Sequence, residues 1–288
     1  MSWPSIPTKL VLRPGVILLE IPNRTLGCAT YTFPQLQEIS TICRSAGVAL
    51  HCDGARLWEI EPFYNATYGK SFADIGALFD SICLSFNKGL GGIAEAMVLH
   101  NDESFIEELK IWQQRAGGRP FTMAYEVINC ERGFLEMVDT FSRKREKMIR
   151  VVKKITDATA MQVNSDGEKI VRFVPVVPTC CQVLTYFDGF DESVLFAARD
   201  KVEQELCVRI FERLRPPLDM MEDTNSTETE TRLLHHPLGL PTKDAVPRGK
   251  KYIEWRIGSV TEKIADEVFV QAYVAFCNAL TCLSSTDT

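Results

Sequence analysis

The chain has 288 residues, of which 45% are hydrophobic and 24% are charged, a balance typical of a folded chain with room for one large domain and a smaller one. Its net charge of −6 leaves no basic face, so we expect no nucleic-acid partner. No apolar run approaches the roughly 18 residues that a membrane span needs, so we expect no membrane partner either.

The ten cysteines show no metal-ligand spacing, and two of them, Cys180 and Cys181, are adjacent. Residues 1–10 lack the apolar core of a signal peptide, because Pro4 and Pro7 interrupt them. Together these features predict a cytoplasmic protein whose thiols are reduced and lie mostly in the core.

The first half of the chain predicts alternating strands and helices, an order that favours parallel pairing with right-handed crossovers. A helix should begin at Thr32–Pro34 and end at Gly47, because proline suits a first turn and glycine suits a C-cap. Asn101 and Asp102 should cap a later helix. The predicted strands are 16–21, 48–53, 81–86 and 94–99, and the predicted helices are 32–47, 72–79, 101–114 and most of 122–156.

A basic group at 143–147 is predicted to lie near a helix C-terminus, where cations interact well with the helix dipole. We expect the lysines of this region to be exposed and protonated; they are Lys144, Lys147, Lys153 and Lys154.

After about residue 159 the pattern changes, with strands predicted at 171–177, 182–187 and 252–257 and helices at 192–211 and 262–280. This order indicates a smaller α+β domain. We therefore predict a large α/β domain at 1–158 and a small domain at 159–288 that carries a long loop at 215–250. His235 and His236, within that loop, are predicted to be solvated rather than metal-bound.

A lysine followed by glycines comes directly after the predicted strand 81–86: Lys88 precedes Gly89. Lysine is almost never fully buried unless its charge is paired or lost. A desolvated amine loses its proton more readily and can attack a carbonyl such as that of pyridoxal phosphate, and glycines would let a flat cofactor approach the backbone. The alternative is a strand-end lysine that reaches solvent while Gly89 makes the turn.

Asp53 ends the neighbouring predicted strand. An Asp in this place can cap a helix or form a turn. Because parallel strands end at one edge of a sheet, Asp53 and Lys88 could also line the same crevice. A lysine that bonds to the aldehyde and an aspartate that keeps the pyridine nitrogen protonated are the groups that pyridoxal phosphate chemistry requires.

Residues 51–59 (HCDGARLWE) and 85–92 (SFNKGLGG) resemble the threonine aldolase / aromatic amino acid β-eliminating lyase family, and 112–118 (WQQRAGG) resembles its arginine–glycine–glycine segment. The resemblance covers about 16–134 and returns weakly at 254–259. It implies the pyridoxal phosphate-dependent transferase-like fold (fold type I), a mostly parallel α/β sheet with flanking helices and a smaller C-terminal α+β domain. It also implies pyridoxal 5'-phosphate as cofactor, an amino acid substrate, and a homodimer or homotetramer.

The resemblance further implies roles for two arginines. Arg56 would lie near the cofactor and substrate, and Arg256 would grip the substrate carboxylate with its planar guanidinium. Other readings stay open: Arg56 as a surface residue at a helix start, and Arg256 in a buried structural ion pair. His51 shares a strand face with Asp53 and could join a proton network or be a satisfied core histidine. Arg115 and Arg119, beside the glycine pair, could reach an anion or solvent.

The implied reaction is cleavage of a β-hydroxy-α-amino acid to glycine and an aldehyde, with β-elimination from another amino acid as the alternative. The family's enzymes also carry an earlier serine–glycine–threonine turn for the cofactor phosphate and a histidine that stacks on the ring, and nothing before Val16 supplies either. Relatives usually have a small residue where Glu95 stands. A truncated, non-catalytic homologue that keeps the fold but binds the cofactor poorly is therefore a third hypothesis.

Overall fold

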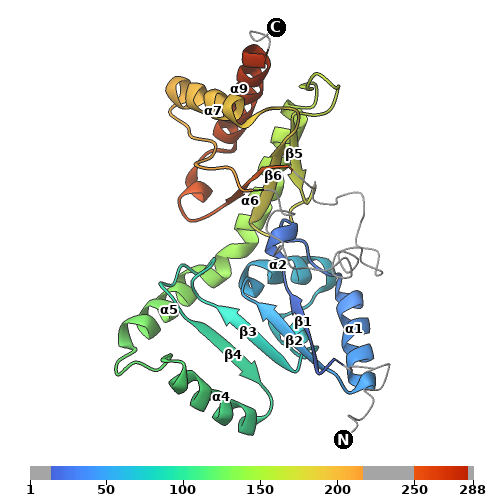
Figure 1. The fold of residues 1–288 in the computed structure, drawn as a ribbon, viewed down its shortest axis with the longest axis vertical. Helices are drawn as coiled ribbons and strands as arrows, with labels where there is room; N and C mark the ends of the chain where they lie inside the picture. The colour runs from blue at the N-terminus through green and yellow to red at the C-terminus, as the bar shows by residue number, and fades with distance from the viewer. Residues whose placement is uncertain (1–13, 217–249, 285–288) are drawn as a thin grey trace, which may run out of the picture.

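The computed structural model describes residues 14–216 and 250–284 and contains two sheets, with a long helix between them (Figure 1). The first sheet has four strands in the order β1 (Val16–Glu20), β2 (Ala49–Gly54), β3 (Ser81–Ser85) and β4 (Ala96–His100). The second has three strands in the order β5 (Val171–Val174), β6 (Gln182–Phe187) and β7 (Tyr252–Arg256).

Helices accompany both sheets. With the first sheet lie α1 (Phe33–Ala46), α2 (Leu57–Tyr68), α3 (Phe72–Gly76), α4 (Glu103–Arg115) and α5 (Ala124–Met137). With the second lie α7 (Glu192–Leu206) and α9 (Asp266–Ser284), which pack against each other. Helix α6 (Phe141–Ala158) contacts both α2 and α9, so it connects the two parts of the structure.

Local sequence signals explain several helix ends. Thr32 and Gln35 form a capping box at the start of α1, and Gly47 ends that helix in the left-handed conformation with a φ of 64°. Asp102 caps α4 by accepting a hydrogen bond from the Ser104 backbone N–H. These ends match the predicted ones. Helix α2, which contains Pro62, was not among the predicted elements.

Strands β1, β2 and β3 are parallel, whereas β4 runs antiparallel to β3. Along β2, Leu50, Cys52 and Gly54 are buried, and the alternate residues face the less covered side of the sheet. This mostly parallel α/β sheet with flanking helices, together with a separate antiparallel sheet, confirms the predicted fold class. The predicted domain boundary after residue 158 coincides with the end of α6 and stays a prediction.

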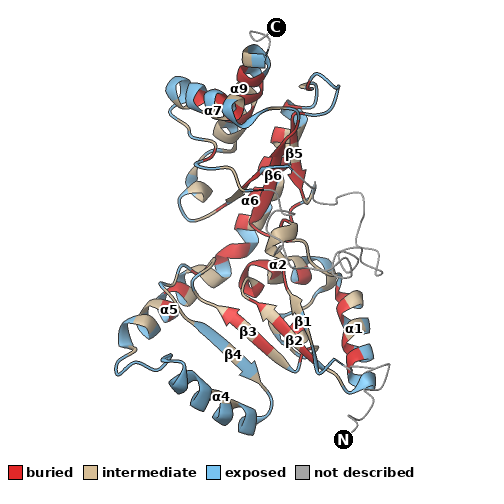
Figure 2. Ribbon diagram, viewed as in Figure 1, coloured by how far each residue is buried: buried red, intermediate tan, exposed pale blue. Residues whose placement is uncertain are grey.

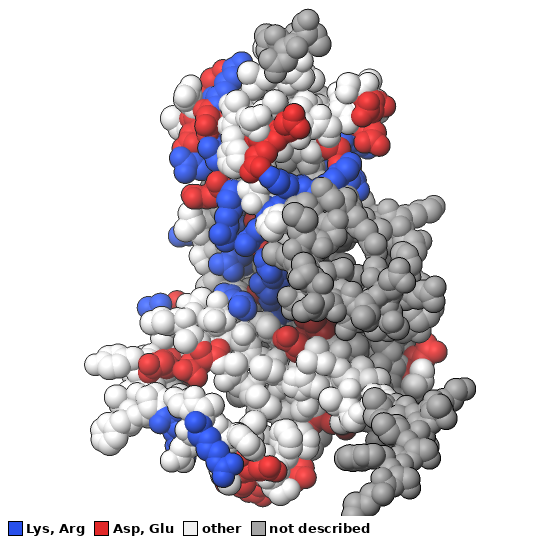
Figure 3. Space-filling model, in the orientation of Figure 1, with Lys and Arg blue, Asp and Glu red and all other residues white. Residues whose placement is uncertain are grey.

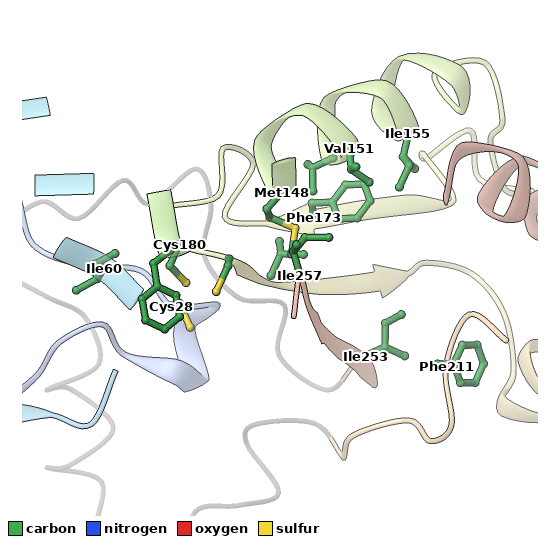
Figure 4. Close-up of a cluster of buried hydrophobic side chains, with 14 of the residues drawn as sticks. Cys28, Ile60, Met148, Val151, Ile155, Phe173, Cys180, Phe211, Ile253 and Ile257 are labelled. Carbon is green, nitrogen blue, oxygen red and sulfur yellow. The ribbon is translucent and has the colours of Figure 1, made fainter. Parts of the chain in front are cut away.

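The main hydrophobic core continues from the first sheet through α6 to the second (Figure 2). Figure 4 shows its middle, where Met148, Val151 and Ile155 of α6 lie with Phe173 of β5 and Ile257. All ten cysteines lie within the described ranges and none of them forms a disulfide there; seven are buried, as predicted for thiols that lie mostly in the core. A cytoplasmic location stays a prediction.

Several predictions about the second half of the chain were wrong in detail. The strand predicted at 171–177 ends at Val174, directly before Pro175. Helix α7 ends at Leu206, not at 211, because Cys207 takes the left-handed conformation there. The last helix begins at Asp266, and the residues from Thr261 to Lys263 form a separate 3₁₀ turn. The basic group 143–147 lies in the first turns of α6, not near its C-terminus.

Helix α9 is long and apolar enough to cross a membrane by length and composition. One side of it packs in the protein, where Tyr273, Phe276, Cys277 and Leu280 are buried against neighbouring elements. The core helix of a folded protein can be equally long and apolar, and the buried side of α9 belongs to the main hydrophobic core. Most of the predicted loop 215–250, including His235 and His236, lies outside the described residues.

Replacing Ile155 tests the role of α6 in the shared core. Ile155 is 0% exposed, so Ile155→Ala should lower the free energy of unfolding by about 2–5 kcal/mol through lost burial and a residual cavity. Urea denaturation followed by circular dichroism measures the change. Lys153→Ala on the exposed face of the same helix is the control and should cost no more than about 0.5 kcal/mol. Equal costs for both variants would contradict this description of the core.

Candidate active site

Asp53 lies at the carboxyl end of β2, on the less covered face of the sheet. It is half-buried and in register with Glu20 on β1 and Cys83 on β3. Its Oδ1 accepts a hydrogen bond of 3.1 Å from the Ala55 backbone N–H, so the predicted turn role is present. This bond uses one oxygen of the carboxylate.

Lys88 lies in the loop that follows β3 and returns antiparallel into β4. The loop is held by backbone hydrogen bonds from Phe86 N–H to the Glu95 carbonyl, from Gly92 N–H to the Phe86 carbonyl, and from Gly91 N–H to the Lys88 carbonyl. The Lys88 side chain is half-buried, and its amine has no hydrogen-bond or ion-pair partner within residues 14–216 and 250–284. Because β2 and β3 are parallel neighbours, Lys88 and Asp53 follow the same edge of the sheet, the one directed toward α6 in Figure 1.

Glu95 closes this loop in a conformation unusual for its residue type, with a φ of 79°. The left-handed region costs an L-residue roughly 1–2 kcal/mol and suits glycine best. This offers a physical reason for the small residue expected at this place in relatives.

The two predicted arginines lie on different parts of the structure. Arg56 is the half-buried residue that precedes α2, and its side chain caps nothing in that helix. Arg256 is the last residue of β7 and is exposed, not mid-strand as the sequence suggested. Its guanidinium makes no ion pair within the described ranges, so the alternative of a buried structural pair is wrong for this residue.

The structural ion pair of β7 belongs to Glu254 instead. Arg24 grips its carboxylate with two bonds, from Nε to Oε1 at 3.1 Å and from an Nη to Oε2 at 2.7 Å. Gln182 Nε2 donates to Oε1 at 2.8 Å, and an Nη of Arg215 lies 3.6 Å from Oε2. Burial alone would raise the pKa of Glu254, but Arg24, with the charges of Arg215 and Arg56, outweighs it and lowers that pKa.

Arg56 therefore lies near enough to Glu254 of β7 for its positive charge to help lower the pKa of that carboxyl. Lys and Arg side chains also gather between the two sheets on the face drawn in Figure 3. A positive region of this kind favours anionic groups such as carboxylates and phosphates.

Two lysines expected at the surface are buried. Lys144 is 2% exposed, and its amine lies 3.9 Å from the Met137 sulfur and over the Phe141 ring. Burial lowers the pKa of Lys144, and the negative charge of Glu262 partly opposes this effect. Lys147 donates to the backbone carbonyls of Glu262 and Ile264. The apolar stems of both lysines follow the buried face of α6, a pattern that a count of charges does not reveal.

The other polar candidates lie apart from the Lys88 loop or are already paired. His51 Nδ1 and Ser81 Oγ are 2.7 Å apart, so this half-buried histidine has a partner. Arg115 is exposed over the Trp112 ring, and Arg119 is exposed as well. Glu59 was not among the predicted site residues, yet it is 1% exposed and contacts the Lys88 loop. Its signal is a charged residue inside the apolar run Leu57-Trp58-Glu59-Ile60.

The sequence pattern of the β-eliminating lyase family matches residues 11–174, so this chain belongs to that family. The match covers the sheet, Asp53, Arg56 and Lys88, and ends at the last residue of β5. The family uses pyridoxal phosphate.

Named relatives agree with this placement. The chain is 38% identical to aldolase vrtJ of Penicillium aethiopicum over 112 residues, which are 39% of this chain and 25% of that protein. It is 34% identical to the low-specificity L-threonine aldolase of Candida albicans over 84 residues, or 29% of this chain and 21% of the relative. A crystal structure of a candidate L-allo-threonine aldolase from Listeria monocytogenes EGD-E superposes with a TM-score of 0.72 at 26% identity, covering 94% of this chain and 63% of that one.

The Arg24–Glu254 contact predicts a pH-dependent loss of stability. A carboxyl whose folded pKa is lowered adds stability above its unfolded pKa, near 4.5, and loses it as the pH falls through the folded value. Glu254→Gln should therefore be less stable than the unchanged protein at pH 7, and the difference should shrink below pH 4.5. Urea denaturation at several pH values measures it, with Glu107→Gln on exposed α4 as the control. A difference independent of pH would contradict this role of Glu254.

Proposed function

We propose that this chain is a pyridoxal phosphate-dependent lyase that cleaves a β-hydroxy-α-amino acid into glycine and an aldehyde. The observation that carries the proposal is the placement of Lys88 and Asp53 after adjacent parallel strands, in a chain that belongs to the β-eliminating lyase family. The threonine aldolases among its relatives support the choice of reaction. The aligned segments cover 25% of aldolase vrtJ and 21% of the Candida albicans aldolase, and this chain covers 63% of the Listeria monocytogenes structure, so the activity of the whole protein is part of the proposal.

The residues present fit two ends of the cofactor. The Lys88 amine is half-buried and without a partner in the described chain, which leaves it available to bond to the aldehyde. The second carboxylate oxygen of Asp53 does not take part in the bond with the Ala55 N–H. It can accept a hydrogen bond from the protonated ring nitrogen of the cofactor. When bound, the cofactor supplies an electron sink for the broken bond.

The chain's own groups would then bind and orient the substrate. We assign the exposed guanidinium of Arg256 to the substrate carboxylate, because its planar fork can grip both oxygens and no other acid occupies it in the described residues. Arg56 adds positive charge to the same region. Fixing the carboxylate sets which bond at Cα is aligned for cleavage. β-Elimination is the second candidate, favoured by the reaction for which the family is named.

We also propose that the chain forms a homodimer or homotetramer in the cytoplasm. Large apolar side chains are exposed on and beside α4 and α5, which supports an interface there. They are Ile111, Trp112, Phe121, Tyr125, Ile128 and Leu135.

Borohydride reduction in the presence of excess pyridoxal phosphate should attach the cofactor to Lys88. Lys144 is 2% exposed and out of reach, while Lys153 and Lys154 are held in ion pairs with acids. Peptide mapping by mass spectrometry locates the label, and Lys88→Arg should abolish it at this peptide. A label spread over surface lysines with none on Lys88 would leave a non-catalytic homologue as the better description.

Asp53→Asn should lower the turnover of threonine to glycine and acetaldehyde roughly 100-fold or more, because the ring nitrogen loses its charged partner. The asparagine oxygen can still accept the Ala55 N–H, so the melting temperature should change little. Glycine release measures turnover, and calorimetry measures stability. Turnover close to that of the unchanged protein would exclude Asp53 from this role.

A further inference from the structure

Glu59, in the first turn of α2, is a buried carboxylate whose partners are unusual. It is 1% exposed, yet no lysine, arginine or histidine of the described chain forms an ion pair with it. A buried charge is costly unless hydrogen bonds replace its hydration. The groups that donate hydrogen bonds to Glu59 therefore indicate which parts of the structure its carboxylate holds in place.

Its two oxygens bind two different parts of the structure. Oε1 accepts a 3.0 Å hydrogen bond from the backbone N–H of Gly89, the residue next to Lys88. Oε2 accepts the Cys181 thiol at 3.4 Å. The Cys181 carbonyl in turn accepts the Ile257 N–H at 2.8 Å, directly after Arg256. One carboxylate thus joins the loop of Lys88 to the strand ends of the second sheet.

The contact with the loop is close. A Cβ at Gly89 would lie 2.7 Å from both Cγ and Oε1 of Glu59, a separation at which atoms overlap. Gly89 therefore allows the carboxylate to approach the backbone, and a larger residue would displace it.

Neighbouring groups support the hydrogen bonds of Glu59. The hydrogen bond that Cys181 donates to Cys180, burial and the negative charge of Glu59 hold the pKa of the Cys181 thiol well above its ordinary value, so the thiol stays protonated. The buried ammonium of Lys144 also feels the negative charge of Glu59. These groups lie on α2, α6 and the segment before β6, so the arrangement exists only in the folded chain.

We propose that Glu59 is a positioning residue of the Lys88 site: its carboxylate fixes the loop that presents Lys88 through the Gly89 N–H and ties that loop to the second sheet through Cys181. The proposal rests on the proposed role of Lys88. It assigns Glu59 no contact with substrate or cofactor.

The test compares two replacements of similar size in the full chain without cofactor. Glu59→Gln keeps an oxygen that can accept the Gly89 N–H, whereas Glu59→Met keeps none. Amide hydrogen exchange of residues 86–92, measured by mass spectrometry, should be roughly 10-fold or more faster in Glu59→Met, as expected for loss of a hydrogen bond to a charged group, and close to unchanged in Glu59→Gln. Indistinguishable exchange in the two variants would overturn the proposal.

Two further variants keep the test decisive if Glu59→Met does not fold. Gly89→Ala leaves Glu59 in the chain but displaces its carboxylate, so it should speed exchange of the same loop. Asp80→Leu is the control, because Asp80 accepts a backbone N–H, that of Leu50, at the opposite end of β2, and leucine keeps no acceptor for it. It should leave residues 86–92 unchanged. Equal loosening of the loop in Asp80→Leu would mean that Glu59 serves only general stability.

Labelling at Lys88 separates this proposal from the proposed function. With pyridoxal phosphate and borohydride, Glu59→Met should lose most of the Lys88 label, whereas Glu59→Gln should retain it. Cys181→Ser keeps a hydrogen-bond donor for Glu59, so it should retain more of the label than Cys181→Ala does. If the unchanged protein takes no label at Lys88, the proposed function fails while hydrogen exchange still decides the role of Glu59. A full label in Glu59→Met would overturn the positioning role.

Discussion

The candidate site depends on the parallel pairing of β2 with β3. The pairing places Asp53 opposite Cys83 and directs the carboxyl ends of both strands to one edge, where the Lys88 loop follows. Side chains alternate along a strand, so a shift of one residue would turn Asp53 toward the buried face and expose Cys52. The buried side chains Leu50 and Leu84 oppose such a shift, and the same burial that stabilises the sheet therefore sets the position of the polar residues.

Two carboxylates between the sheets, the buried Glu59 and the partly buried Glu254, have different kinds of partner. Glu254 is held by the two-pronged grip of Arg24 and by Gln182. Glu59 is held by neutral donors, an N–H and a thiol, with Lys144 nearby. Removing one partner of a buried charge costs more than the pair itself contributes, because the remaining charge stays desolvated. The relative placement of β7 and the Lys88 loop is therefore tied to these contacts.

The loop of Lys88 combines an amine that has no partner in the described part of the chain with a backbone held by several hydrogen bonds. Three backbone hydrogen bonds and the Glu59 carboxylate hold its main chain, while Glu95 at its end occupies the left-handed region. Restraint of the backbone reduces the entropy lost when a side chain is positioned for reaction. The Lys88 amine has no ion pair with any residue that the structure describes, and on a loop held in this way it fits the covalent role that we propose for it.

Local signals determined much of the fold: Thr32, Gly47 and Asp102 set helix ends within a few residues, and apolar runs marked the strands of both sheets. The motifs around Asp53 and Lys88 identified the edge of the sheet that matters, because strand ends are encoded locally. Burial was decided by tertiary packing. Lys144 and Lys147 are buried because α6 lies between two sheets, and Arg256 is exposed because β7 ends there. The partners of Glu59 and Glu254 are far away in sequence, and no local pattern specifies a contact that the packing of distant elements creates.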